Sequence, residues 1–289
     1  MSKLNKIIRI FKGNKPFQRV VDAIILRLPF DIGKILRIKI KIQDFNIRLH
    51  QSSLSLAYWH NPNDRIEDYS FLTSYLSEND IYIDIGANIG TTVIPAAKRI
   101  KAGKVIGFEP HPKTFSFLED NVRINNLSDS VELQNCALGN ERGSVKFSSD
   151  LGDDMNKVLT AGEGIIVTVK LLDDVGEKFE RIDLIKIDVE GYEKFVVEGG
   201  IKTLEKTECI YFEISEDHFK SFGYSVKDLL LILGKIGFRF YMKKEGKLLE
   251  EIDHDHKLKE HHANAFAVRN IEEFKKRTGW KVYGDTIKN

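Results

Sequence analysis

Carboxylates stand at or near the ends of four short apolar runs that are typical of buried strands. They are Asp84, Glu109, Asp188 and Glu213. In an open parallel sheet, ligands bind beyond the carboxyl ends of the strands. Burying a charge without a partner is costly, so contact with a ligand explains these positions better than chance does. We therefore expect a binding site at this edge of the sheet.

A glycine-containing turn follows the first of these runs, in the segment Asp84-Ile-Gly-Ala-Asn-Ile-Gly90. Glycine lets the chain turn tightly and lets a ligand approach the backbone. Glu109 follows Gly86 by 23 residues, and a carboxylate there can accept two hydrogen bonds from a ribose diol. This pattern predicts a nucleoside-binding strand–helix–strand unit, with a helix that starts just after Gly90. The alternative is a purely structural turn and a surface glutamate.

The spacing of the glycines disfavours a dinucleotide. The fingerprint Gly-x-Gly-x-x-Gly requires glycine at the positions that Asn88 and Thr91 occupy. No Gly-Lys-Ser/Thr sequence follows a strand-like run either, which argues against a phosphate-binding loop. An adenosyl group without phosphates fits better.

A second group of charged residues lies in the segment Lys186-Ile-Asp-Val-Glu-Gly-Tyr-Glu193. Alternation along a strand puts Lys186 and Asp188 on one face. Glu190 and Glu193 then fall in the first turn of a helix, where the helix dipole favours carboxylates. Asp188, Glu190 and Glu213 are candidates for the base in a proton transfer. Structural roles remain the alternative. Glu193 would then stabilise the helix N-terminus, and Glu213 would form an ion pair with Lys186.

Histidines gather near the C-terminus in a segment that is also rich in lysine and glutamate. The group comprises His254, His256, His261 and His262, with Asp253 and Asp255. Such residues can bind transition metals, but close neighbours in a loop rarely converge on one ion without fixed geometry. We interpret the segment as a solvated loop, expect no metal ligand in this protein, and expect activity to survive chelation.

The elements that must position these residues alternate between strand and helix. Strand-like runs occupy 81–85, 105–109, 131–134, 184–189 and 209–214, and helical periods occupy 63–77, 112–125, 192–206 and 225–236. Such alternation predicts parallel strands joined by right-handed crossovers. Residues 144–147 and 165–170 add two strand-like runs, and 238–242 and 265–268 predict an antiparallel pair that closes the sheet.

The first 50 residues differ in charge from the rest of the chain. They hold 12 Lys and Arg against 3 Asp, a net charge of +9, whereas the whole chain has a net charge of +1. Residues 4–11 and 17–28 have helix-like apolar spacing, and 38–42 and 45–49 predict a hairpin. This segment predicts contact with an anionic membrane surface or an anionic acceptor. An ordinary solvated basic face is the alternative.

The bulk composition is that of a globular protein of 289 residues, with 42% hydrophobic and 30% charged residues. Its near-neutral charge does not suggest a nucleic-acid binder. Cys136 and Cys209 lie in apolar runs, so we expect two buried thiols in a reducing cytosol. No apolar stretch reaches the ~20 residues that span a bilayer, and the N-terminus lacks the pattern of a secretory signal. We expect a cytoplasmic protein.

These motifs resemble the FkbM family of methyltransferases over roughly residues 64–270. The resemblance rests on the segments 84–90, 107–112 and 185–193, together with Asn121 and Asn125. It implies an α/β fold with a Rossmann-like, seven-stranded class I methyltransferase sheet, mostly parallel with an antiparallel last strand. It also implies S-adenosylmethionine as cofactor and O-methylation of sugars or natural products. Residues 64–289 would form this domain, and residues 1–63 an N-terminal extension of helices and a hairpin.

The resemblance also implies roles for single residues. Gly86 and Gly90 would lie along the methionine part of the cofactor, with Asn88 between them and Asp84 near the amine. Glu109 would hold the ribose. Asn135 and Ala137, on either side of Cys136, would lie along the adenine. Apart from the resemblance, the place of Asp188 at the end of the fourth strand predicts that it faces the sulfonium, with Lys186 holding it and Glu190 and Glu213 as the other catalytic candidates.

The expected reaction is methyl transfer to a hydroxyl group of a sugar, a glycan or a small natural product. Two alternatives stay open. One is a nucleic-acid methyltransferase on the same fold, although the chain has no Asn/Asp-Pro-Pro-Tyr/Phe motif and we expect no nucleic-acid partner. The other is a non-catalytic module that binds an adenosyl group or a glycan. The sequence does not identify the acceptor.

Overall fold

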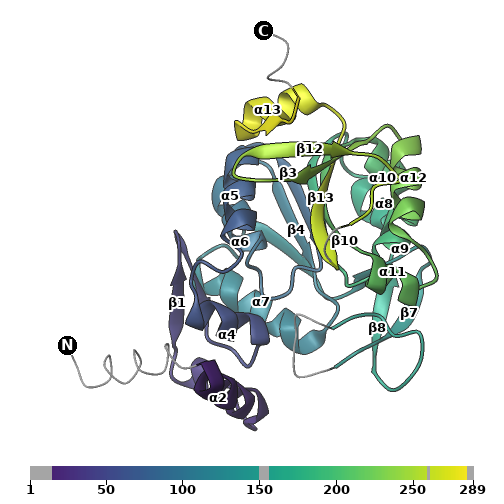
Figure 1. Ribbon diagram of the computed structural model, residues 1–289. Helices are drawn as coiled ribbons and strands as arrows, with labels where there is room; N and C mark the ends of the chain where they lie inside the picture. The colour runs from purple at the N-terminus through teal and green to yellow at the C-terminus, as the bar shows by residue number, and fades with distance from the viewer. Residues whose placement is uncertain (1–14, 150–155, 259–260, 285–289) are drawn as a thin grey trace.

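A nine-stranded sheet forms the centre of the protein in a computed structural model that describes residues 15–149, 156–258 and 261–284 (Figure 1). In spatial order the strands are β5 (Val131–Gln134), β4 (Lys104–Phe108), β3 (Ile81–Ile85), β9 (Ile182–Ile187), β10 (Thr207–Ser215), β13 (His262–Val268), β11 (Arg239–Lys243), β12 (Leu248–Ile252) and β14 (Lys281–Val282). The five strands from β5 to β10 are parallel, and β13 is antiparallel to both of its neighbours.

This arrangement confirms the predicted mostly parallel α/β sheet with an antiparallel strand near its far end. The predicted count of seven strands is not confirmed. The seven predicted runs that belong to this sheet, five parallel and two antiparallel, are all present in it, and β12 and β14 extend the edge beyond β11. The sequence did not predict strand β12, because two of its five residues are glutamates.

Helices cover both faces of the sheet, because alternate strand residues point to opposite sides. Tyr82 and Leu184 belong to one apolar cluster, and their strand neighbours Ile83 and Ile185 belong to another. The first cluster is covered by α5 (Ile66–Tyr75), α6 (Val93–Arg99), α7 (Pro112–Ile124) and α13 (Ile271–Thr278). The second is covered by α8 (Leu172–Gly176), α9 (Glu193–Glu198), α10 (Ile201–Glu205), α11 (Glu216–Ser221) and α12 (Val226–Lys235). Cys136 and Cys209 are buried free thiols, as expected.

A small second sheet follows β5 and stands beside the strand ends. Its order is β6 (Ala137–Leu138), β8 (Ile165–Lys170) and β7 (Gly143–Phe147). The two strand-like runs predicted for this region are therefore confirmed. Their inward side chains, including Phe147 and Val167, form a separate apolar cluster.

The N-terminal extension contains more helix than the sequence predicted. It comprises α2 (Lys15–Arg27), α3 (Ile32–Ile35), the hairpin β1 (Lys39–Ile42) and β2 (Phe45–Arg48), and α4 (Ser53–His60). The hairpin and α2 were predicted, whereas the short α3 and α4 were not. The helix expected over residues 4–11 lies outside the described residues. No helix within the described ranges is long and apolar enough to cross a membrane.

The extension packs on α7 through two asparagines. Asn125 accepts a hydrogen bond from the Asn46 backbone N and donates one to its carbonyl. Asn121 accepts from the Arg48 backbone N and donates to the Ile89 carbonyl in the glycine turn. Apolar residues of the hairpin and α4 also share one core cluster with α5 and α6. The boundary at residue 63 remains a prediction, but the two parts share a core.

Candidate functional site

The glycine turn after β3 has the backbone that its sequence requires. Gly86 has a φ of +86°, and a Cβ atom there would lie 1.9 Å from the Asp188 carbonyl oxygen. Only glycine therefore allows the ends of β3 and β9 to approach this closely. The backbone N–H groups of Gly86 and Ala87 donate to the Phe108 carbonyl, which closes the turn against β4. Helix α6 begins two residues after Thr91, near the predicted start.

A cleft opens at these strand ends and contains about 860 Å³ of empty space, part of it open to solvent. Of the predicted site residues, those on its wall are Gly86, Asn88, Glu109, Ala137, Lys186, Asp188 and Glu190. Its apolar side comes largely from the second sheet and the loop before it, through Cys136, Leu138, Phe147 and Val158.

Glu109 is held rigidly at the end of β4. Its side chain is buried, and its two oxygens accept hydrogen bonds from the backbone N–H groups of Asn88 (3.0 Å) and His111 (2.8 Å). A carboxylate oxygen has more than one acceptor site, so both can also accept from a ligand hydroxyl. Asn135 does not line the cleft. Its side-chain amide donates to the carbonyls of Glu109 and Pro110, and so fixes this loop from behind.

Two other predicted cofactor residues also lie behind the wall rather than on it. Gly90 has a φ of +92°, and a Cβ atom there would lie 2.6 Å from the side chain of Leu118, so its role in the structure is packing. Asp84 is fully buried and accepts hydrogen bonds from the hydroxyls of Tyr82 (3.0 Å) and Thr92 (2.5 Å). Burial raises the pKa of Asp84, against the effect of nearby Lys186.

The other oxygen of Asp84 is unusual. Oδ1 is buried and makes no hydrogen bond to any described residue, and it lies 3.8 Å from Lys186 Nζ. A buried acceptor without a hydrogen bond is costly. Asp84 thus faces the site through Thr92 and Lys186, which both line the cleft.

Lys186 and Asp188 form the ion pair that the strand alternation predicted. Lys186 Nζ lies 2.9 Å from Asp188 Oδ2. Burial acts to raise the pKa of Asp188, but the adjacent Lys186 outweighs it and the pKa is lowered. Burial likewise opposes the charge on Lys186, but Asp188 and Asp84 raise its pKa. Both groups are therefore charged at neutral pH.

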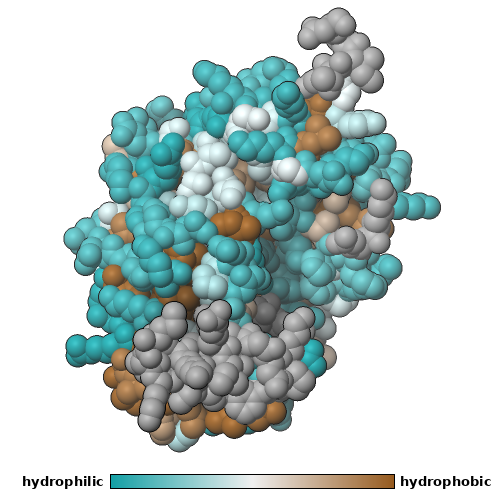
Figure 2. All heavy atoms as spheres, turned by 60° about the vertical axis from the view of Figure 1, so that its left-hand side comes forward, coloured by the Kyte–Doolittle hydropathy of each residue, from teal (hydrophilic) through white to brown (hydrophobic). Residues whose placement is uncertain are grey.

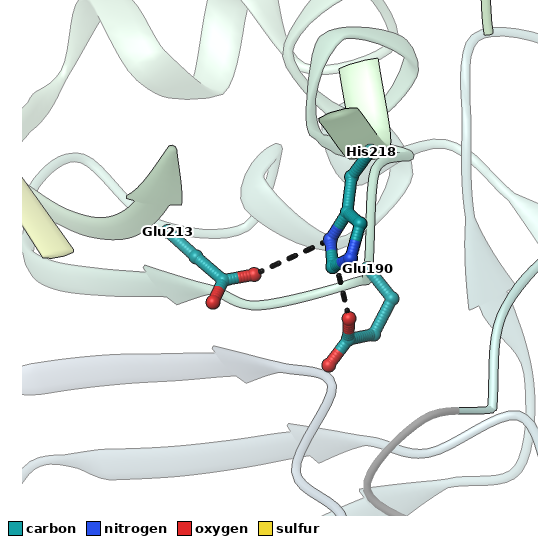
Figure 3. A group of neighbouring side chains, drawn as sticks. All are labelled: Glu190, Glu213 and His218. Carbon is teal, nitrogen blue, oxygen red and sulfur yellow. Dashed lines mark ion pairs between the residues drawn. The ribbon is translucent and has the colours of Figure 1, made fainter. Parts of the chain in front are cut away.

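Glu190, Glu213 and His218 converge (Figure 3), and the two glutamates line the same hollow as this ion pair. His218 Nδ1 lies 3.3 Å from Glu190 Oε2 and 3.8 Å from Glu213 Oε2. Burial and the charge of Asp188 raise the pKa of Glu190 to about 8 and also raise that of Glu213. Burial lowers the pKa of His218. One ligand atom from each of the three lies within 4.8 Å of the others, so the group could hold either a shared proton or a metal ion.

A second, more polar hollow adjoins the cleft, and five residues line both cavities. They are Arg65, Asp68, Lys186, Asp188 and Glu190. The second hollow is completed by Glu67, Tyr211, Glu213, His262 and Asn264. The Tyr211 hydroxyl donates to Asp68 at 2.5 Å. The ion pair of Lys186 and Asp188 therefore stands where the two cavities meet.

The sequence did not identify Arg65, Asp68, Tyr211 or His218. None of them belongs to a local motif, and Asp68 and Tyr211 are 143 residues apart in the chain. Arg65 has one signal that only the backbone shows, a left-handed φ of 50° just before α5. Such strain in a residue other than glycine is often found at functional sites.

The histidine-rich segment does not assemble a site of its own. His254 pairs with Asp255, and His261 pairs with Asp217, both at the exposed surface. His262 lines the polar hollow. Within the described part of this segment, no three ligand atoms converge.

Comparison with known proteins adds a family match. The Methyltransferase FkbM domain matches residues 84–240. The chain is 30% identical over 141 residues to the hexuronic acid methyltransferase AglP of Haloferax volcanii, which covers 47% of this chain and 56% of that one. It is 27% identical over 177 residues to the 2-O-methyltransferase NoeI of Sinorhizobium fredii, covering 54% of this chain and 72% of that one.

Shorter and partial matches accompany these. Identity to a tRNA (guanine(37)-N(1))-methyltransferase of Dictyostelium discoideum is 32% over 80 residues, which covers 27% of this chain and 16% of that one. Two further methyltransferases are matched over 59% and 64% of their own length. The chain thus spans about three fifths of the length of these curated relatives.

Proposed function

Because the chain belongs to the FkbM methyltransferase family, we propose that it transfers the methyl group of S-adenosylmethionine to a hydroxyl of a sugar, a glycan or a small natural product. One observation carries the proposal. A cleft with a rigid carboxylate for a ribose meets a polar hollow at the ion pair of Lys186 and Asp188. A cofactor in the cleft and a hydroxyl in the hollow would then approach each other across Asp188.

The residues of the cleft fit S-adenosylmethionine. Glu109 would accept hydrogen bonds from the ribose hydroxyls, because both of its oxygens are fixed by backbone N–H groups. The apolar wall around Ala137 and Phe147 would contact the adenine. Asp188 on the cleft wall, with Asp84 buried behind it, makes this end of the cleft carboxylate-rich, which suits a ligand with an amine and a sulfonium. When bound, the cofactor supplies an activated methyl group.

The polar hollow fits a hydroxylated acceptor. Arg65 and Asn264 offer donors, and Asp68, Glu213 and the Tyr211 hydroxyl oxygen offer acceptors, which is the mixture that binds a polyol. AglP and NoeI, by their names, methylate a hexuronic acid and a 2-hydroxyl, and this supports a sugar as the acceptor class.

Asp188 is the proposed base. Lys186 holds its carboxylate ionised, and its side chain keeps 30% of its exposure, so an acceptor can reach it. Glu190 is a weaker candidate in the free enzyme, because its pKa of about 8 leaves it protonated at neutral pH. The in-line displacement depends mainly on alignment of the hydroxyl with the methyl group, and Asp188 would orient the hydroxyl and accept its proton.

The test is a screen of tritiated-methyl transfer from S-adenosylmethionine. Hexuronic acids, lipid-linked sugars, glycans and small hydroxylated metabolites form one arm, and total RNA forms the other. We expect label in the first arm, with loss of label in Glu109→Ala. Label in RNA alone would favour a nucleic-acid methyltransferase. Cofactor binding without transfer to any class would favour a non-catalytic module. The proposal places the reaction in the cytoplasm, where two buried thiols stay reduced.

A further inference from the structure

Large apolar side chains are exposed mainly at one end of the molecule. Five of the eight large apolar residues that the described chain exposes lie in the N-terminal extension: Val20, Ile24, Phe30, Ile35 and Leu36, each at least 48% exposed. Figure 2 shows apolar surface at the lower end of the molecule, where α2 lies in Figure 1. An apolar patch of this kind usually marks an interaction surface. We call these five residues the N-terminal face.

Basic residues flank the N-terminal face on both of its elements. On α2, Val20 and Ile24 are four residues apart and so share one side of the helix. The shallow groove that they line also contains Arg19 and Arg27. At the end of α3 and just after it, Lys34 and Arg37 directly flank Ile35 and Leu36 in the sequence. Basic residues therefore stand beside the apolar ones on both elements.

A basic hollow lies beside the same segment, between the extension and α7. It has about 850 Å³ of empty space, part of it open to solvent. Five of the seven residues that line it are cationic: Lys34, Arg37, Lys39, Arg48 and Arg123. The other two are Asp120 and Ile124, and Asp120 is paired with both Arg48 and Arg123. Five cations around one carboxylate leave an excess of positive charge that suits an anion.

One cation of this hollow, Arg48, is buried and held in place. Its side chain is only 8% exposed and is fixed by the ion pair with Asp120. Its Nη1 atom is buried and makes no hydrogen bond to any residue that the structure describes. A buried donor without an acceptor is costly. Because Arg48 also lines the hollow, the hollow offers an anion a fixed guanidinium group as well as a positive field.

We propose that the N-terminal face and the basic hollow seat the enzyme on an anionic membrane surface. The apolar residues would enter the boundary between headgroups and acyl chains, while the basic hollow takes a lipid phosphate. Stable attachment of a peripheral protein generally takes two such signals. A second copy of the chain is a poorer occupant, because a two-fold contact would set the basic rims against each other.

The experiment is flotation of the full chain with vesicles. One set contains phosphatidylcholine alone, and the other contains equal parts of phosphatidylcholine and phosphatidylglycerol. We expect binding to the anionic vesicles only, and weaker binding at high salt. Ile35→Asp with Leu36→Asp, and separately Lys34→Glu with Arg37→Glu, should each lower the partition coefficient by roughly tenfold or more, because each pair removes one of the two signals.

Matched controls lie elsewhere on the exposed surface. Ile166→Asp removes an exposed apolar side chain on β8, and Lys101→Glu with Lys247→Glu makes the same charge change far from the extension in sequence. These variants should float like the wild type. Unchanged melting temperature and affinity for S-adenosylmethionine should show that every variant is folded. A loss of vesicle binding then reports on the substituted surface residues.

Several outcomes would overturn the proposal. They are equal flotation with neutral vesicles, flotation with neither kind, and controls that lose binding as strongly as the N-terminal variants. Titration with inorganic phosphate separates a free anion from a headgroup: phosphate binding without flotation would assign the basic hollow to a soluble phosphate compound. A dimer in sedimentation velocity that Leu36→Asp dissociates would assign the N-terminal face to a second copy.

Discussion

Asp188→Asn removes a single negative charge at the meeting point of the two cavities. The substitution keeps the size of the side chain and the possibility of a hydrogen bond with Lys186, whose Nζ lies 2.9 Å away in the native protein. Lys186 keeps a second carboxylate, Asp84, at 3.8 Å. We therefore expect the variant to fold and the arrangement of the cleft to persist.

The expected loss follows from the role of the carboxylate. A positioned general base contributes about 10²- to 10⁴-fold to a rate, and a hundredfold loss corresponds to about 2.7 kcal/mol in the activation barrier. The native Asp188 is ionised at neutral pH because Lys186 lowers its pKa. The variant therefore loses a carboxylate that is ready to accept a proton. We expect turnover at saturating S-adenosylmethionine to fall by about 10²-fold or more, and cofactor affinity to change much less.

Two measurements test this. Tritiated-methyl transfer to the acceptor found in the screen gives turnover, and calorimetry gives the affinity for S-adenosylmethionine. Asp183→Asn is the matched control, because Asp183 lies on the same strand at the opposite end, where it binds the Ile81 backbone N. That variant should change stability but not turnover. If Asp188→Asn instead weakens cofactor binding and leaves turnover nearly intact, Asp188 only positions the cofactor. In that case the base would be Glu190 or Glu213.

Four further predictions concern the site and the buried carboxylate Glu193 next to it in the sequence. Glu109→Ala should weaken S-adenosylmethionine binding by roughly tenfold or more in calorimetry, since charged hydrogen bonds contribute about 1.5–3 kcal/mol; unchanged affinity would contradict the ribose assignment. Lys186→Met should raise the pKa of Asp188, so the acid limb of the pH–turnover profile should move to higher pH; an unmoved limb would argue against this ion pair. Burial raises the pKa of Glu193 from 4.5 to about 8, so its contribution to stability is present below pH 4.5 and is lost as the pH rises to 8. Between pH 4.5 and 8 the melting temperature of Glu193→Gln should therefore fall less than that of the native protein. An equal fall in both proteins would contradict this prediction. Turnover should survive EDTA, because Lys186 already supplies a cation beside Asp188; loss that magnesium or manganese restores would make Glu190, Glu213 and His218 the ligands.

Much of the fold could be predicted because the parallel strands are continuous apolar runs. Strands β3, β4, β9 and β10 are buried on both faces, and their sequences show it. Strand β12 escaped prediction for the opposite physical reason. It lies in the antiparallel part of the sheet, and its sequence Leu-Leu-Glu-Glu-Ile has neither a continuous apolar run nor strict alternation. Its pairing with β11 is a tertiary interaction that local sequence does not encode.

The candidate site was predictable in part. Strand ends and alternation brought Glu109, Lys186 and Asp188 to the cleft wall, where the structure has them. The same reasoning could not predict how deeply a side chain is buried. Asp84 also lies near the end of a strand, but its side chain is fully buried and accepts a hydrogen bond from Thr92. Residues that reach the site from helices distant in the sequence belong to no local sequence motif. His218 on α11 is an example.

The bridge formed by Asn121 has a thermodynamic consequence. One amide accepts a hydrogen bond from the backbone of Arg48, in the basic hollow, and donates one to Ile89, in the glycine turn of the cofactor cleft. A ligand that alters the order of Asn121 on one side, and thereby the position of Ile89 or Arg48 on the other, would couple the two sites. Such a coupling free energy is reciprocal. If occupancy of the hollow tightens cofactor binding by some factor, the cofactor tightens occupancy of the hollow by the same factor.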